Sequence, residues 1–224
     1  MMSKILLIET SSEVCSVGLI KDDYLRVIYE EKGGNIHAQK APVFVENILK
    51  EHSIDAVAVS SGPGSYTGLR IGVSLAKGLA YGKNIPLISV STLDAMANYI
   101  INVFPIESDA VVLPVIDARR MEVYTAAYNS KCEKITNIQP VVIDQNSFES
   151  YLPVKLYIAG NAAKKTYENI NYPNKVIVEV IPSAKNMVEI AVKKFNNDEF
   201  ENLAYFEPFY LKQFLATKPK KRLL

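Results

Sequence analysis

The chain is poor in the residues that build metal and disulfide sites. Its 224 residues include two cysteines, two histidines and no tryptophan. Two cysteines are too few for a disulfide framework or a thiolate metal site, so we expect a reducing, cytoplasmic location. His37 and His52 lie fifteen residues apart, which is not the one-turn spacing of a helical metal site. Metal chemistry and a secreted disulfide scaffold are therefore both disfavoured.

Long apolar runs and excess charge are also missing. Only four apolar residues separate Lys4 from Glu9, and no run approaches the ~18 residues of a membrane-spanning helix. We therefore expect neither a signal peptide nor a membrane anchor. The formal net charge of +1 predicts no broad attraction to nucleic acid, so a tRNA contact would need a local patch or a partner. The basic stretch at 218–222 is interpreted as a solvated tail, with a phosphate contact as the alternative.

The order of the predicted elements repeats once along the chain. Residues 4–9 form an apolar strand that leads into I-E-T-S-S, and a second strand returns at 15–20. Residues 111–117 form another apolar strand that leads into I-D-A-R-R, with a hairpin partner at 122–128. Strand, acidic residue, turn and strand therefore occur twice, about a hundred residues apart. This duplication predicts two related lobes.

The remaining pattern alternates strands with helices, as α/β proteins do. Asn35, Ser65 or Thr67, and Ser183 are the candidate helix caps. Further strands are predicted at 24–31, 56–60, 86–90, 155–159 and 175–181, and helices at 35–52, 67–81 and 92–101, after Gly160 and after Ser183.

The most distinctive stretch is 60–81, S-S-G-P-G-S-Y-T-G-L-R-I-G-V-S-L-A-K-G-L-A-Y. Its helix carries a row of small residues, Gly68, Gly72, Ala76 and Ala80, beside a row of larger apolar ones. Small side chains allow close packing, either within the chain or against another protein. The glycine spacing G-x-G-x-x-x-G is one residue too long for the dinucleotide fingerprint, and the P-loop pattern is absent.

Four motifs together resemble the TsaB (YeaZ) family, bacterial accessory proteins for making N6-threonylcarbamoyladenosine (t6A) in tRNA. They are K-I-L-L-I-E-T-S-S at 4–12, S-G-P-G-S-Y-T-G-L-R-I-G at 61–72 with A-K-G-L-A at 76–80, D-A-R-R-M-E-V-Y at 117–124 and F-E-P-F-Y-L-K at 206–212. The resemblance runs over nearly the whole chain and diverges most at 129–202.

The resemblance implies an actin-like ATPase (ASKHA) fold with two related lobes, each a mixed sheet flanked by helices. We expect an N-terminal lobe at 1–103 that carries the partner-binding helices, a C-terminal lobe at 104–200, and a C-terminal segment with the basic tail at 201–224. It also implies TsaD as a heterodimer partner, TsaE as a second partner, a homodimer when TsaD is absent, and tRNA contact only through the complex.

The partner interface is expected on two helices, at 38–51 and 67–81. The residues predicted to line it are Gly68, Leu69, Gly72, Val73, Ala76, Ala80, Ala41 and Val45. In this interpretation the small side chains let a helix of TsaD approach closely.

The resemblance also bears on cofactors. The related TsaD carries H-x-x-x-H after P-L-I-x-V, two histidines that hold a metal, whereas Thr92 and Met96 stand at those positions here. We expect no metal and no catalytic residue. Actin-like ATPases hold phosphates at their hairpin turns, so a weak ATP or ADP contact is expected at Thr10, Ser11, Ser12, Asp117 and Gly160 if nucleotide binds at all.

The function that follows is a non-catalytic scaffold, required by TsaD for threonylcarbamoyl transfer to adenosine 37 of tRNA and helping to recruit TsaE. One alternative is a metallopeptidase of the glycoprotease-like group, which the missing H-x-x-x-H disfavours. Another is a small-molecule phosphotransferase, for which Asp117 is the candidate base.

Overall fold

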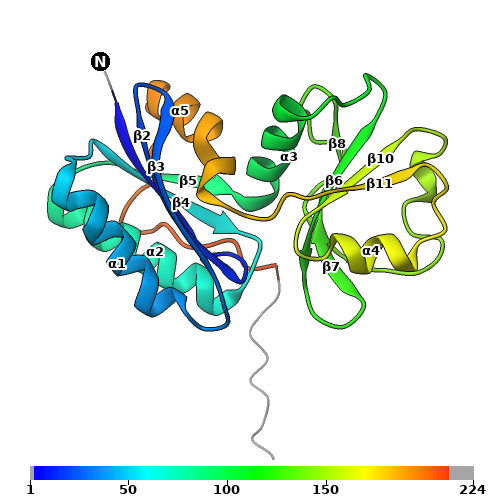
Figure 1. Cartoon of the computed structure of the whole chain (residues 1–224), viewed down its shortest axis with the longest axis horizontal. Helices are drawn as coiled ribbons and strands as arrows, with labels where there is room; N and C mark the ends of the chain where they lie inside the picture. The colour runs from blue at the N-terminus through cyan, green and yellow to red at the C-terminus, as the bar shows by residue number, and fades with distance from the viewer. Residues whose placement is uncertain (1–2, 212–224) are drawn as a thin grey trace, which may run out of the picture.

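Two lobes lie side by side, each built on one twisted β-sheet (Figure 1). The structure is a computed structural model that describes residues 3–211. The first sheet has the order β3-β2-β1-β4-β5, in which β1 is central and buried from its second residue to its last. Its strands are β1 (Lys4–Glu9), β2 (Val14–Lys21), β3 (Tyr24–Lys32), β4 (Ala56–Gly62) and β5 (Leu87–Ser91).

The second sheet repeats the arrangement of the first. Read from β9, its order is β9-β7-β6-β10-β11, and β8 (Tyr128–Asn129) pairs with the start of β6. In both sheets two antiparallel pairings lie on one side of the central strand and two parallel pairings on the other. The predicted duplication and the actin-like two-lobed fold are confirmed. The strands are β6 (Val111–Asp117), β7 (Glu122–Thr125), β9 (Gln139–Val142), β10 (Leu156–Ala159) and β11 (Lys175–Val178).

Two helices cover the outer face of the first sheet. They are α1 (His37–Glu51) and α2 (Tyr66–Lys83), which pack on each other and on a core formed by alternate residues of β1, β2 and β4. Ser65 caps α2, since its hydroxyl accepts a hydrogen bond from Gly68 N at 3.2 Å. The predicted Asn35 cap is wrong: Asn35 has a φ of 59°, and α1 begins after Ile36 with no side-chain cap.

The helices that follow the last strand of each sheet change lobes. The helix α3 (Thr92–Val103) leaves the first sheet and packs on the second, where its apolar face joins β6 and β10 in one core. The 3-10 turn η2 (Ala184–Met187) and α5 (Val188–Asn196) leave the second sheet and pack on the inner face of the first. Ser183 caps this turn with a capping box, as predicted, although a 3-10 turn comes before the helix.

The predicted domain limits divide the chain by residue number, whereas two helices pack on the sheet of the other lobe. The limit at 103/104 falls at the end of α3, which belongs to the first lobe by sequence and to the second sheet by packing. The second lobe has one outer helix, α4 (Ala163–Asn169), and the short 3-10 turn η1 (Glu149–Tyr151) at the chain position where the first lobe has α1. Among the described residues no helix is long and apolar enough to cross a membrane.

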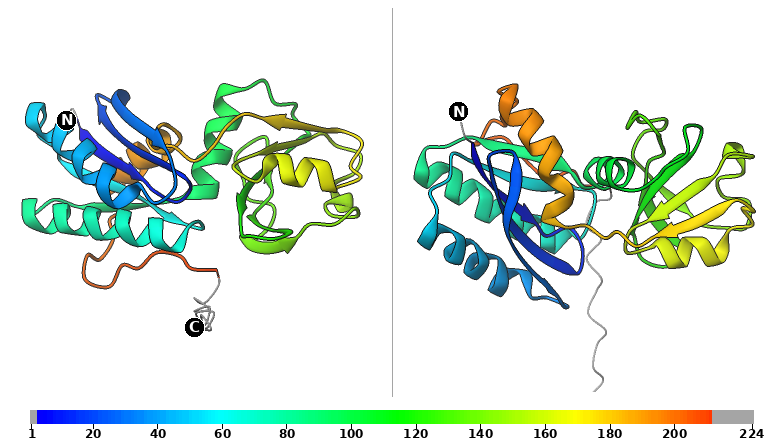
Figure 2. Two further views of the ribbon diagram at one scale, coloured as in Figure 1. Left: turned by 60° about the horizontal axis from the view of Figure 1, so that its bottom comes forward. Right: turned by 45° about the horizontal axis from the view of Figure 1, so that its top comes forward.

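Residues 199–211, here called the strap, return to the first lobe along α2 (Figure 2). Glu201 N donates to Leu87 O at 2.8 Å, and Phe209 N donates to Ser61 O at 2.7 Å, so main-chain bonds tie the strap to β5 and β4. Lys77 Nζ donates to the main chain of the strap from the flank of α2. The predicted basic tail at 218–222 lies outside the described residues.

Candidate functional site

The residues predicted to line a partner interface lie in the core of the first lobe. All eight are buried, Val73 among them with 5% of its surface accessible. A side chain enclosed by its own chain is not available to a partner, so these positions are corrected to core residues. They are Gly68, Leu69, Gly72, Val73, Ala76, Ala80, Ala41 and Val45.

The row of small residues serves close packing inside the lobe. A Cβ atom added to Gly68 would lie 2.0 Å from Thr10 O, and one added to Gly72 would lie 2.2 Å from Thr10 Oγ1. Thr10 Oγ1 also donates to Gly68 O at 2.9 Å. The glycines therefore let α2 touch the turn after β1. Of the two interpretations left open by the sequence, packing within the chain is the one realised here.

The opposite side of α2 is exposed and carries two further glycines. Gly78 and Gly82 are solvent-exposed, and a Cβ atom added at either would meet nothing within 4 Å. Glycine inside a helix costs about 1 kcal/mol relative to alanine, so the fold itself gives no reason for these two. They are one helical turn apart, and Ser74 lies one turn before them. The four-residue spacing of Ser74, Gly78 and Gly82 is visible in the sequence. A helical wheel alone, however, does not show which row of small residues faces solvent.

The outer side of α1 continues this surface. Val43 is 45% exposed there, Ala38 and Pro42 are exposed, and on α2 Ile71 is half-buried and Tyr81 is 81% exposed. The small and apolar residues on the outer sides of the two helices, all exposed except the half-buried Ile71, are here called the α1–α2 face: Ala38, Pro42, Val43, Ile71, Ser74, Gly78, Tyr81 and Gly82. Such a face can receive a helix of another protein chain.

The turn after β1, predicted as a phosphate loop, is enclosed by the chain. Thr10, Ser11 and Ser12 are all buried, and Ser65 N donates to Ser11 O at 2.7 Å. Ser11 Oγ is buried without a hydrogen-bond partner among the described residues, and the turn at Gly64 lies against it. Glu9, at the end of β1, is 1% exposed, and burial raises the pKa of its carboxyl despite a hydrogen bond from Ser11 N at 2.6 Å.

The equivalent turn of the second lobe is open and paired differently. Asp117 is exposed, and its carboxylate forms an ion pair with Lys165, whose ammonium also donates to Arg120 O and Glu122 O. Gly160 has a φ of +117°, and a Cβ atom there would lie 2.0 Å from Val115 O. Gly160 thus allows a close main-chain contact, comparable to that of Gly68 in the first lobe.

One residue links the two turns across the lobes. Asn161 Oδ1 accepts a hydrogen bond from Asp117 N at 2.9 Å, and Asn161 Nδ2 donates to Glu13 Oε2 at 3.0 Å. The structure therefore places both predicted loops at the same side of the interlobe boundary. Their polar groups do not fit the phosphates of ATP or ADP, because the hydroxyls of the first turn are enclosed and Asp117 is held by Lys165.

The positions that hold histidines in the related TsaD are closed. Thr92 is 1% exposed at the start of α3, and Met96 is fully buried in the core of the second lobe. His37 is 6% exposed at the first residue of α1, and His52 follows its last residue. Among residues 3–211 no three His, Cys, Asp or Glu side chains gather closely enough to hold a metal ion.

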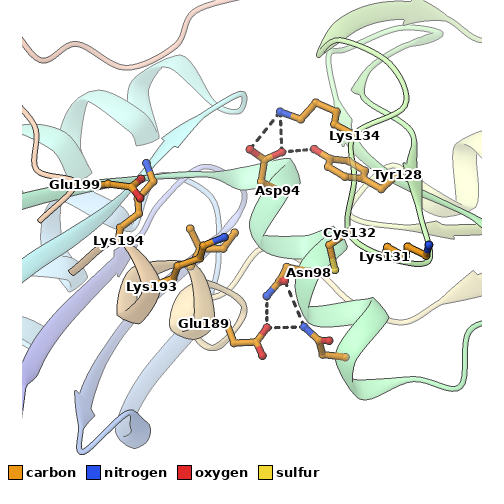
Figure 3. Close-up of a pocket in the computed structure, with 12 residues that line it drawn as sticks. Asp94, Asn98, Tyr128, Lys131, Cys132, Lys134, Glu189, Lys193, Lys194 and Glu199 are labelled. Atoms are coloured by element: carbon orange, nitrogen blue, oxygen red, sulfur yellow. Dashed lines mark hydrogen bonds and ion pairs between the residues drawn. The ribbon is translucent and has the colours of Figure 1, made fainter. Parts of the chain in front are cut away.

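A groove that the sequence did not predict runs between α3, α5 and the turn after β8 (Figure 3). It has a volume of about 690 Å³. Its walls come from three segments far apart in the chain, which is why no local pattern indicates it. We call it the α3–α5 groove; it is lined by Asp94, Asn98, Asn102, Tyr128, Lys131, Cys132, Lys134, Glu189, Ile190, Lys193, Lys194 and Glu199.

Comparison with known proteins finds a matching family model and several similar TsaB proteins. The family model described as TsaD: tRNA N6-adenosine threonylcarbamoyltransferase matches residues 28–223. The tRNA threonylcarbamoyladenosine biosynthesis protein TsaB of Escherichia coli K12 is 29% identical, over 96% of this chain and 97% of that protein. TsaB of Bacillus subtilis 168 is 34% identical over 63% of this chain and 61% of its own length. The solved structure of YeaZ from Pseudomonas aeruginosa superimposes with a TM-score of 0.79 at 26% identity, covering 94% of this chain and all of that one.

Proposed function

The chain belongs to the family described as TsaD: tRNA N6-adenosine threonylcarbamoyltransferase and resembles its TsaB relatives, and from this premise we propose that it is a non-catalytic subunit in t6A formation. A role in t6A formation is supported by the TsaB relatives, which are tRNA threonylcarbamoyladenosine biosynthesis proteins and match nearly the full chain. In the proposed role the chain acts in the cytoplasm and binds TsaD, which transfers the threonylcarbamoyl group from threonylcarbamoyl-adenylate to adenosine 37 of tRNA.

The non-catalytic part of the proposal is supported by what occupies the candidate catalytic positions. Thr92 and Met96 are buried in packing roles. The carboxylate of Asp117, the candidate base of a phosphotransferase, is engaged by the Lys165 ammonium. That ion pair occupies a carboxylate oxygen that a general base would need to present to its substrate. The proposed role therefore uses no metal and no nucleotide bound by this chain alone.

The observation that carries the partner proposal is the α1–α2 face. Gly78 and Gly82 leave open space on an exposed helix, where alanine would give a more stable helix. A partner helix that packs against them would approach more closely than side chains permit elsewhere on α2, and the contact would offset the cost of the glycines. We assign this face to TsaD, with a second copy of this chain as its occupant when TsaD is absent. TsaE would join the assembly that this pair forms.

The substitution Gly78→Arg tests this assignment. An arginine at this open position leaves the fold intact, because no atom lies within 4 Å of its Cβ, but it places a long charged side chain between the helices. We expect co-elution with TsaD to be lost and the apparent dissociation constant to rise at least about a hundredfold, as for a central interface position. Glu168→Arg on the exposed side of α4 is the matched control, since it disturbs only an exposed ion pair with Lys164.

The role itself is tested by reconstitution. Unmodified tRNA, threonylcarbamoyl-adenylate, TsaD and TsaE are combined with and without this chain, and the digested nucleosides are measured by mass spectrometry. We expect modified adenosine only when the chain is present. Equal product without the chain would refute the scaffold role. Full binding of the Gly78→Arg variant to TsaD would refute the interface and leave the role standing.

A further inference from the structure

The α3–α5 groove carries lysines on opposing walls. Lys193 and Lys194 project from α5 on one side, and Lys131 and Lys134 come from the turn after β8 on the other, as Figure 3 shows. The two walls belong to helices and turns of different lobes, so the basic residues meet only in the folded chain. With a formal net charge of +1 for the whole sequence, this gathering of lysines is a local feature.

Two of the acidic side chains in the groove are held by the protein itself. Asp94 accepts a hydrogen bond from the Tyr128 hydroxyl and forms an ion pair with Lys134 at 2.9 Å. Glu189 accepts hydrogen bonds from the amides of Asn98 and Asn102. Their oxygens are therefore engaged by groups of the walls and floor, and they are poor partners for a ligand cation.

Two lysines remain uncommitted. Lys194 Nζ donates to Ser89 O at 3.0 Å, whereas within residues 3–211 no hydrogen bond or ion pair holds the ammonium group of Lys131 or Lys193. Both residues are exposed. Lys131 and Lys193 therefore place an unpaired ammonium group on each wall of a groove of about 690 Å³, and positive charge gathered at a groove attracts anions.

We propose that the α3–α5 groove binds the phosphate backbone of RNA, with Lys131 and Lys193 contacting phosphates from the two walls. The choice of RNA rests on the proposed function, in which tRNA is the substrate of the complex. The groove offers no free aromatic face for a base, because the Tyr128 hydroxyl is bound to Asp94 and Lys134 lies over the ring at 5.9 Å. Contacts of this kind position an RNA without reading its sequence.

A cysteine in the groove can be used to detect whether the groove is occupied. Cys132 lines it and is half-buried, while Cys15, the other cysteine, is fully buried in the first lobe. A thiol-alkylating reagent applied to the full-length chain at one fixed pH should therefore modify Cys132 first. We expect an unmodified tRNA transcript at low salt to slow alkylation of Cys132 at least about fivefold, since RNA in the groove would cover the thiol.

The double variant Lys131→Gln/Lys193→Gln tests which groups hold the RNA. We expect it to lose the protection of Cys132 and to weaken tRNA binding, measured by fluorescence anisotropy. Two lost phosphate contacts should reduce the slope of log K against log salt concentration by about 1.5. Lys21→Gln/Lys164→Gln, two exposed lysines outside the groove, removes the same charge and should leave protection and slope nearly unchanged.

Three results would overturn the proposal. The first is that tRNA fails to slow the alkylation of Cys132. The second is that the groove variant and the control variant give the same slope of log K against log salt concentration. The third is that inorganic pyrophosphate protects Cys132 at the same concentration as tRNA, which would identify a small-anion site. None of these assays needs TsaD or product formation. If tRNA does not bind the groove but the reconstitution yields modified adenosine only with the chain, the proposed function stands and the groove proposal is wrong. If tRNA protects Cys132 but the chain is not needed for product, RNA binding stands and the scaffold role is wrong.

Discussion

The two lobes share one strand order and differ in what covers it. In the first lobe the outer face of the sheet carries α1 and α2, of 15 and 18 residues. In the second lobe it carries α4, of seven residues, and a three-residue 3-10 turn. The sheet is therefore the part that both halves keep, and the outer layer is the part in which they differ. The α1–α2 face belongs to the lobe with the thicker layer, which is why we assign the partner to that side.

The acidic residues that end the two central strands show the same divergence. Glu9 is buried at the end of β1, and burial raises the pKa of its carboxyl. Asp117 is exposed and paired with Lys165. Equivalent positions in a duplicated framework therefore have opposite environments, one enclosed by the chain and one open to solvent.

The largest expected effect distinguishes the two sides of α2. Ala76→Glu would place a carboxylate in the fully buried row, where no cation is available to pair with it. We expect the free energy of unfolding, measured with urea and circular dichroism, to fall by at least about 3 kcal/mol. The control is Lys164→Glu on the exposed side of α4, which should change stability by less than about 0.5 kcal/mol. An Ala76→Glu chain as stable as the parent would show that the row is not buried.

A second effect depends on pH and is confined to the buried acid. A carboxyl whose pKa is raised on folding favours the protonated folded state, so its contribution to stability is lost as pH rises through the folded pKa. Glu9→Gln removes this pH-dependent contribution to the free energy of unfolding. We therefore expect the variant to gain stability relative to the parent as the pH rises above the ordinary range of a glutamate carboxyl, measured by urea unfolding at a series of pH values. A difference that stays constant over these pH values would mean that Glu9 does not carry the raised pKa.

The smallest effect is expected at the exposed acid. Asp117→Asn removes an ion pair that is partly open to water, and Lys165 keeps its bonds to Arg120 O and Glu122 O. We expect a loss of no more than about 1 kcal/mol, which should shrink further in 1 M salt. A larger, salt-independent loss would mean that the Asp117 ion pair is shielded from water, and the contrast in exposure between the two acids would be removed.

The strands and their duplication were predictable from the sequence because each is a local pattern. Apolar runs such as 56–60 and the repeated strand, acid and turn fixed the two hairpins, and Ser65 and Ser183 marked two caps correctly. β9 was missed: its four residues include Pro140 and are mostly exposed, so only its pairing with β7 makes it a strand. That pairing is a long-range contact that no local window contains.

The candidate site was less predictable than the fold. A helical wheel separated the small residues of α2 from the larger ones, but burial depends on the position of the sheet, and the row with Ala76 proved to face it. The exposed glycines, Gly78 and Gly82, were not among the residues predicted to line the interface. The α3–α5 groove is assembled from α3, the 129–134 turn and α5, and so depends on the tertiary arrangement alone.

The exchange of helices between the lobes bears on how such a chain could have arisen. Each half supplies its last helix to the other half's sheet, α3 to the second and α5 to the first. A single ancestral half, ending after its helix, would have exposed both an apolar helix face and an apolar sheet face. Two identical copies that swapped these helices would have covered all four surfaces. Gene fusion of such a swapped dimer would preserve every contact, and neither half would need to fold alone at any stage.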